Sequence, residues 1–166
     1  MVRGDQAKVE VLVRVSPAEA FRIFTEEIDG WWRSGLKYRI AGGPRSRGGE
    51  SGRSVIHLEP KLGGRLLESA GETIHEKGVV TSWDPPRRVV FEWRAVNFAP
   101  GEKTEVEVLF DETRSGTNVT VIHRGWARIR EDHPVRHGQE PSAFTRTMGM
   151  WWGDLVTAFR MRAEAS

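Results

Sequence analysis

Apolar and polar residues alternate strictly near the start of the chain. In residues 8–15, KVEVLVRV, the four valines occupy every second position, which predicts a half-buried strand. Ser16, Pro17 and Glu19 follow in the order of a helix cap, a proline suited to the first helical position and a capping box. We therefore expect a helix that begins at residue 17 and ends near residue 25.

Six further stretches have the composition of strands, after a second short helix or turn expected over residues 26–32. Short turns rich in Gly, Pro, Asn and Asp separate them. Because a parallel crossover needs a dozen or more residues, connections this short favour antiparallel neighbours. With the first strand, the sheet has about seven strands. The six ranges are 54–59, 65–69, 73–83, 87–94, 104–111 and 117–124.

The C-terminal stretch, about 140–163, has a helical period. Its apolar residues fall at 144, 148, 151, 152, 155 and 159, which is one face of a helix with 3.6 residues per turn. Such a helix spans roughly 33 Å and can cross the whole sheet. The order of elements predicts an α+β fold in which a curled antiparallel sheet faces one long helix. A gap between a curved sheet and a straight helix is a natural place for a ligand.

Composition narrows the possible functions. The 166 residues suit a single domain, 1–166, with a core over about 8–163. The absence of cysteine excludes a disulfide scaffold, thiol catalysis and metal sites built on thiolates. A net charge of +2 is too small to indicate a nucleic-acid partner. No long apolar run is present, so we expect no membrane insertion and a cytoplasmic location.

Several local motifs resemble one protein family. The segments EPKLGGR at 59–65 and WDPPRRVVFEW at 83–93 are similar to the signature stretch of the activator of heat-shock-protein-90 ATPase-like proteins. These form a branch of the SRPBCC superfamily of START-like domains. The segments VSPAEAF at 15–21, IDGWW at 28–32 and HRGW at 123–126 resemble other parts of that family. The resemblance implies a helix-grip fold, in which the sheet wraps around the C-terminal helix and two short helices follow the first strand.

The resemblance also implies a choice of functions. The superfamily mostly binds apolar or amphipathic small molecules in a cavity under the long helix, and this is our leading hypothesis. Some members are cyclases, dehydratases or hydrolases, so an enzyme of the same fold is the first alternative. The second is a co-chaperone-like partner of a heat-shock ATPase. The co-chaperone that names the branch uses an additional N-terminal domain, for which this chain has no room, so we expect no ATPase stimulation by this chain alone.

His123 and Glu68 are the candidate catalytic residues. His123 shares a strand face with Val119 and Val121, and an imidazole on the inner face could act as a general base. Glu68 could pair with His123 or His57, and the two groups of such a pair would shift each other's pKa. The alternatives are a core histidine satisfied by hydrogen bonds and a structural carboxylate. The sequence leaves both a catalytic and a structural role open for each of these residues.

Large aromatic residues are the second candidate feature. Seven Trp and seven Phe accompany a single Tyr. They form either a packed aromatic core or the lining of a pocket. The expected ligand-binding residues are Trp32, His57, Phe91, Trp93, His123, Trp126, Phe144, Met148, Trp151, Trp152 and Leu155.

Metal and cofactor motifs are weak. His133 and His137 have a metal-ligand spacing for a helix, but Pro134 lies between them, so we expect no metal site. The loop 41–53 is rich in Gly and Arg but lacks the residues of a phosphate loop, and no cofactor is expected. Gly149 and Gly153 inside the long helix allow close packing, pocket volume or a helix contact. A homodimer is the default oligomer.

Overall fold

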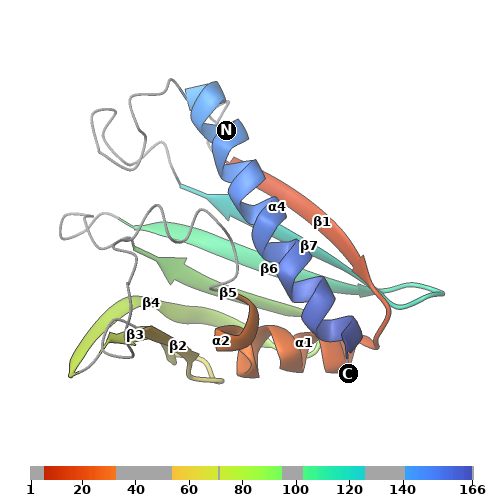
Figure 1. Cartoon of the computed structure of the whole chain (residues 1–166), viewed down its shortest axis with the longest axis horizontal. Helices are drawn as coiled ribbons and strands as arrows, with labels where there is room; N and C mark the ends of the chain where they lie inside the picture. Colours follow the sequence, from red (N-terminus) through yellow and green to blue (C-terminus); the bar gives the residue numbers. More distant parts are fainter. Residues whose placement is uncertain (1–5, 33–53, 71, 95–102, 126–140, 166) are drawn as a thin grey trace.

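An antiparallel sheet curls around one long helix, and two short helices lie at one end of that helix (Figure 1). The computed structural model describes residues 6–32, 54–70, 72–94, 103–125 and 141–165. The expected helix-grip α+β fold is confirmed. The elements are β1 (Gln6–Val13), α1 (Pro17–Glu26), α2 (Ile28–Trp31), β2 (Ser54–Leu58), β3 (Arg65–Ala70), β4 (Thr73–Asp84), β5 (Arg88–Trp93), β6 (Thr104–Glu112), β7 (Thr117–Arg124) and α4 (Pro141–Ala165).

The sheet has seven strands in the order β1-β7-β6-β5-β4-β3-β2. Strands β2 to β7 form a meander, and β1 pairs with the last strand, so every pair is antiparallel. Val9 pairs with Val121, and Val121 pairs with Val108. Because side chains alternate between the two faces, such rows place every second residue on the inner face, toward α4.

The first strand begins and ends two residues earlier than expected. It covers Gln6–Val13 instead of 8–15. Val13 pairs with Thr117, which is the first residue of β7, so the strand has no partner on that side beyond this point. The Thr117 hydroxyl donates to the carbonyl oxygen of Val15 at 2.8 Å, and Ser16 then begins the helix cap. The chain therefore leaves the sheet where its neighbour starts.

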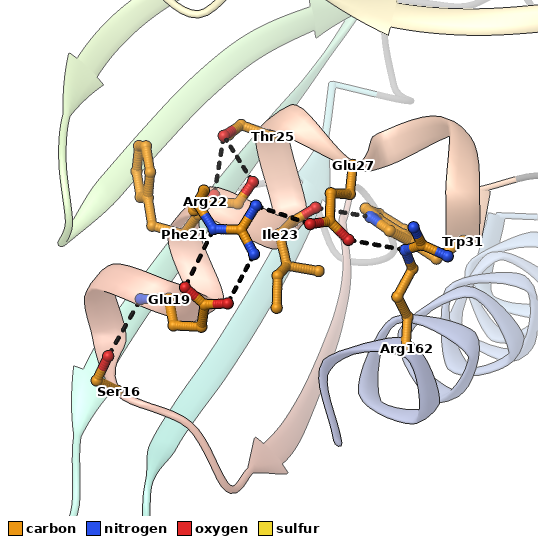
Figure 2. A network of polar contacts seen from close by, with 9 residues as sticks. All are labelled: Ser16, Glu19, Phe21, Arg22, Ile23, Thr25, Glu27, Trp31 and Arg162. Carbon is orange, nitrogen blue, oxygen red and sulfur yellow. Dashed lines mark hydrogen bonds and ion pairs between the residues drawn. The ribbon is translucent and has the colours of Figure 1, made fainter. Parts of the chain in front are cut away.

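A chain of ion pairs joins the short helices to the C-terminal end of α4 (Figure 2). The Ser16 hydroxyl caps α1 by accepting from the Glu19 amide at 3.2 Å. Arg22 donates to Glu19 at 2.6 Å and to Glu27 at 2.7 Å, and Arg162 of α4 donates to Glu27 at 2.9 Å. The hydrogen bond from Arg22 is the main cause that lowers the pKa of Glu27. These partly exposed pairs orient the helices more than they stabilise them.

Aromatic side chains fill the space between α4 and the sheet near the short helices. Phe24 lies 4.7 Å from Trp31 and 5.4 Å from Phe159 between ring centroids, and 5.8 Å from Phe110. These four rings are fully buried. Tilted and edge-to-face pairs at such distances are favourable beyond the area that they bury. At this end, packed aromatic side chains occupy the space between helix and sheet where a gap was expected.

Some expectations fall on residues outside the described ranges. These are the loop 41–53, nearly all of the loop 125–138 with His133 and His137, and Trp126. In the part of the chain that is described, no helix combines the length and apolar character that crossing a membrane requires.

Replacing glycine with alanine should change the free energy of unfolding in opposite directions at two positions. A Cβ on Gly153 in α4 meets no atom of the described residues within 4 Å, so none of those residues requires a glycine at this position. Gly153→Ala should raise the free energy of unfolding by up to about 1 kcal/mol, because Gly is a poor helix former.

A Cβ on Gly78 would overlap the carbonyl oxygen of Glu92. Gly78→Ala should lower the free energy of unfolding by ~1–3 kcal/mol. Urea unfolding of both variants measures this, and equal effects would contradict it.

Candidate functional site

The inner face of the sheet becomes polar at one end. This end lies where β5 and β7 finish and where β4 and β6 begin. His123 is fully buried there, Thr104 is 2% exposed and Lys77 is 7% exposed. Buried polar groups of this kind need partners, so their contacts decide what the site can do.

His123 lies in the middle of a hydrogen-bond chain that we call the histidine relay. The Trp152 indole of α4 donates to His123 Nδ1 at 2.9 Å. His123 Nε2 lies 2.6 Å from Thr104 Oγ1. The Thr104 hydroxyl donates to the carbonyl oxygen of Trp93 at 3.1 Å. The relay thus links the long helix to three neighbouring strands.

The directions of these bonds fix the tautomer of His123. An indole nitrogen can only donate, so His123 Nδ1 must be the acceptor and carries no proton. The proton is therefore on Nε2, which donates to the Thr104 hydroxyl. That hydroxyl can accept this bond because its own proton goes to the Trp93 carbonyl. Each bond in the relay has one donor and one acceptor.

Burial keeps His123 neutral. Desolvation lowers the pKa of His123 to about 3, because the imidazolium would lose its hydration in the core. Both ring nitrogens are already engaged with Trp152 and Thr104. A general base needs a nitrogen that reaches the proton it removes. The geometry of His123 therefore favours a structural role, and its catalytic role stays a prediction.

A second group of polar residues, Glu68, His75 and Lys77, forms what we call the inner polar cluster. Leu66 is buried on the inner face, and Glu68 follows it by two residues on the same strand face. Glu68 pairs directly with His75 of β4, so the two side chains share that face. The register of β3 and β4 shifts between Leu66 and Leu67, where the bulge brings Lys77 to the interior.

The Lys77–Glu68 ion pair is largely removed from water. Lys77 Nζ lies 3.3 Å from Glu68 Oε1, and the side chains are 9% and 19% exposed. The same ammonium lies 5.8 Å from the centroid of the Trp93 ring. Removing two charges from water costs several kcal/mol, which their attraction offsets only in good geometry. Glu68 thus has Lys77 as an ion-pair partner.

His75 carries a polar atom that lacks a hydrogen bond. Its Nε2 is buried and has no hydrogen-bond partner among the described residues. Burial lowers the pKa of His75, and the charge of Lys77 lowers it further, against the opposing effect of Glu68. The imidazole is therefore uncharged at neutral pH. Sequence reasoning missed His75, because Ile74 beside it suggests the opposite face of the strand for the core.

Trp93 joins the two polar groups into one surface. Its indole ring faces Lys77 on one side and meets the His123 ring edge-to-face at 5.4 Å. His123 in turn lies edge-to-face with Trp152 at 5.9 Å. The arrangement offers apolar rings beside fixed polar atoms, which is the composition of a small-molecule site.

The expected ligand-binding residues divide into three groups. Phe91, Trp93, His123, Trp152 and Leu155 are buried between sheet and helix, and Trp32 is also buried, 5.3 Å from Trp152 between ring centroids. His57 is exposed on the outer face, because Ile56 and Leu58 on either side of it point inward. The structure therefore does not bring His57 to the site. The side chains of Phe144, Met148 and Trp151, and the whole of Trp126, lie outside the described part.

Two shallow hollows lie elsewhere, around the turn between β4 and β5. They have volumes of about 400 and 410 Å³ and share Pro85 and Pro86. Phe21 and Trp83 line one, and Phe110 lines the other. Neither touches the inner polar cluster. The described residues also contain no group of three or more potential metal ligands.

The comparison with known families decides the identity at the family level. The family model described as "Activator of Hsp90 ATPase homolog 1-like protein" matches residues 14–146. The chain belongs to this family. The match includes β2 to β7 and therefore the inner polar cluster and most of the relay. The expected family resemblance is confirmed, while no curated protein sequence matches the chain.

Solved structures show the same fold at low sequence identity. Protein MLL2253 from Mesorhizobium loti matches with a TM-score of 0.64 and 14% identity, over 97% of this chain and 98% of that one. Protein SA2116 from Staphylococcus aureus, of unknown function, matches at 0.62 and 16%, over 96% and 93%. PFC0360w, an HSP90 activator from Plasmodium falciparum, matches at 0.59 and 17%, over 95% and 94%. These likenesses support the fold of the family member described above.

Acid should destabilise this family member through His123. The unfolded histidine has a pKa of about 6.5, and the folded one about 3. Between these values the unfolded state binds one more proton, so the contribution of His123 to stability is present above pH 6.5 and falls with pH. The loss has a slope of ~1.4 kcal/mol per pH unit and ends below the folded pKa. Urea unfolding from pH 7 to 4 measures it.

The matched control is His123→Gln, which cannot titrate in this range. Its free energy of unfolding should be lower at pH 7 and should depend less on pH, by the slope of one proton. Equal slopes in the two proteins would show that His123 is protonated in the folded state.

Proposed function

We propose that this protein binds a small apolar or amphipathic molecule on the inner face of its sheet, beside the inner polar cluster. One observation carries the proposal: an ion pair, Lys77–Glu68, is buried on the concave face against Trp93. Lysine is rarely buried, and apolar residues of the same volume are often at least as stabilising as a buried pair. A binding role explains why polar atoms are kept there.

The apolar surroundings supply the other half of such a site. Leu66, Ile56 and Phe91 are buried on the same inner face as the cluster. Binding sites for small molecules typically combine apolar walls with a few fixed polar groups. The residues expected from the sequence on the N-terminal half of α4, namely Phe144, Met148 and Trp151, extend this proposal, together with Trp126.

Binding is better supported than acid–base catalysis by His123 and Glu68. The His123 nitrogens are held by Trp152 and Thr104, and Glu68 pairs with Lys77. Catalysis by two groups needs both to reach one reacting position. The relay instead supports a rigid wall that positions Trp93 and Trp152 around a ligand.

Partnership with a heat-shock ATPase is the second candidate. The family model and the Plasmodium falciparum structure, an HSP90 activator, favour it. A fold shared at 17% identity does not carry an activity with it. An ATPase assay with purified heat-shock protein tests this candidate, and a several-fold stimulation by the full chain would support it.

Native mass spectrometry tests the binding proposal. The full chain, purified under native conditions, should carry a bound molecule that is lost on denaturation. Lys77→Met should reduce the bound fraction at least about tenfold, because the buried ion pair is broken and the Glu68 carboxylate beside the bound molecule loses the charge that offsets its own. The measurement compares native and denatured masses of both proteins.

Lys103→Met is the matched control. Lys103 also pairs with a glutamate, Glu92, at 2.9 Å, but its side chain is 48% exposed. This variant should keep the bound molecule. A wild-type chain without any bound molecule, or equal loss in both variants, would count against the proposal.

A further inference from the structure

The inner polar cluster has almost no net charge. Lys77 and Glu68 carry opposite charges 3.3 Å apart, and His75 is uncharged at neutral pH. Two further charged groups act on His75 in opposite directions: Arg94 lowers its pKa and Glu76 raises it. A molecule that enters here meets fixed dipoles rather than a field of one sign.

We propose that the inner polar cluster recognises an uncharged hydroxyl or carbonyl group of the bound molecule, with His75 Nε2 as the direct hydrogen-bond partner. This inference rests on the binding function proposed above. Nε2 is buried without a hydrogen-bond partner among the described residues, and this observation carries the inference, since buried polar atoms almost always have a partner. A neutral imidazole nitrogen either donates to a carbonyl oxygen or accepts from a hydroxyl, depending on its tautomer.

Charged ligand groups fit the cluster poorly. A carboxylate would lose its hydration and gain little, because Glu68 already offsets the charge of Lys77. An ammonium group would face Lys77 at short range and find Glu68 already paired. A purely apolar molecule would leave His75 Nε2 buried without a partner. An uncharged oxygen avoids all three costs.

His75 should therefore contribute to binding rather than to stability. An unsatisfied buried donor or acceptor costs free energy, so replacing it with an apolar group of similar shape is neutral or stabilising. His123 is the opposite case, because its ring makes two hydrogen bonds in the relay. His75→Phe and His123→Phe thus form a contrasting pair within one protein.

The binding test uses three probes with one skeleton. They are 2-naphthol, which is uncharged at neutral pH, 2-naphthoate, which is an anion, and naphthalene. Backbone NMR shifts of the full chain report binding at the inner face. The dissociation constant of 2-naphthol should be at least about tenfold lower than those of the other two probes. His75→Phe should abolish this preference.

His57→Phe is the control, because it makes the same substitution on the exposed outer face of the same sheet, in β2. It should retain the preference for 2-naphthol. Equal affinities for all three probes at the inner face would overturn this inference and leave the binding function standing. If no probe shifts inner-face resonances, the binding function fails as well. Tighter binding of 2-naphthoate would also overturn the inference.

Urea unfolding gives a readout that needs no ligand. The unfolding midpoint of His75→Phe should match or exceed that of the wild type, while His123→Phe should lower it. His75→Leu is a second, smaller variant in case the larger ring is not accommodated. A loss of stability in both His75 variants equal to that of His123→Phe would overturn the assignment of His75 to ligand recognition.

Discussion

The burial of one neutral histidine constrains the arrangement of this protein. His123 has no exposed surface, so each of its ring nitrogens needs a partner in a fixed direction. Trp152 supplies the donor from α4, and Thr104 receives the proton in β6. The long helix is therefore held against the sheet by directional bonds in addition to apolar contact. This link also sets the positions of Trp93 and Trp152.

Two regions of the inner face serve different purposes. Near α1 and α2, rings such as Phe24, Trp31 and Phe159 pack against one another and stabilise the fold. On the inner face of β4, Lys77 and His75 keep polar atoms inside at a cost in stability. A protein that needed only stability would gain from apolar residues at these positions. The binding function that we propose accounts for this cost.

A period of two in the apolar residues explains why the fold was predictable. Val106, Val108 and Phe110 occupy every second position of 104–111, as do Val119 and Val121 in 117–124, and the structure places both strands within one residue of those bounds. The site was less predictable, because the β-bulge beside Lys77 reverses the expected faces and buries Lys77 while Ile74 is exposed. The two hydrogen bonds of His123 in the relay join residues that are separated by 19 and 29 positions in the sequence, so no local sequence pattern predicts the relay. His57 had a plausible sequence position but lies on the outer face.

Nitrogen-detected NMR of the histidine rings tests the central claim most directly, because it reports the proton on each nitrogen. We predict that His123 remains the neutral tautomer protonated on Nε2 from pH 7 to 4, and that ligand binding changes the Nε2 signal of His75 far more than that of His123. An imidazolium signal from His123 at pH 5, or a ligand response at His123 with none at His75, would contradict the account.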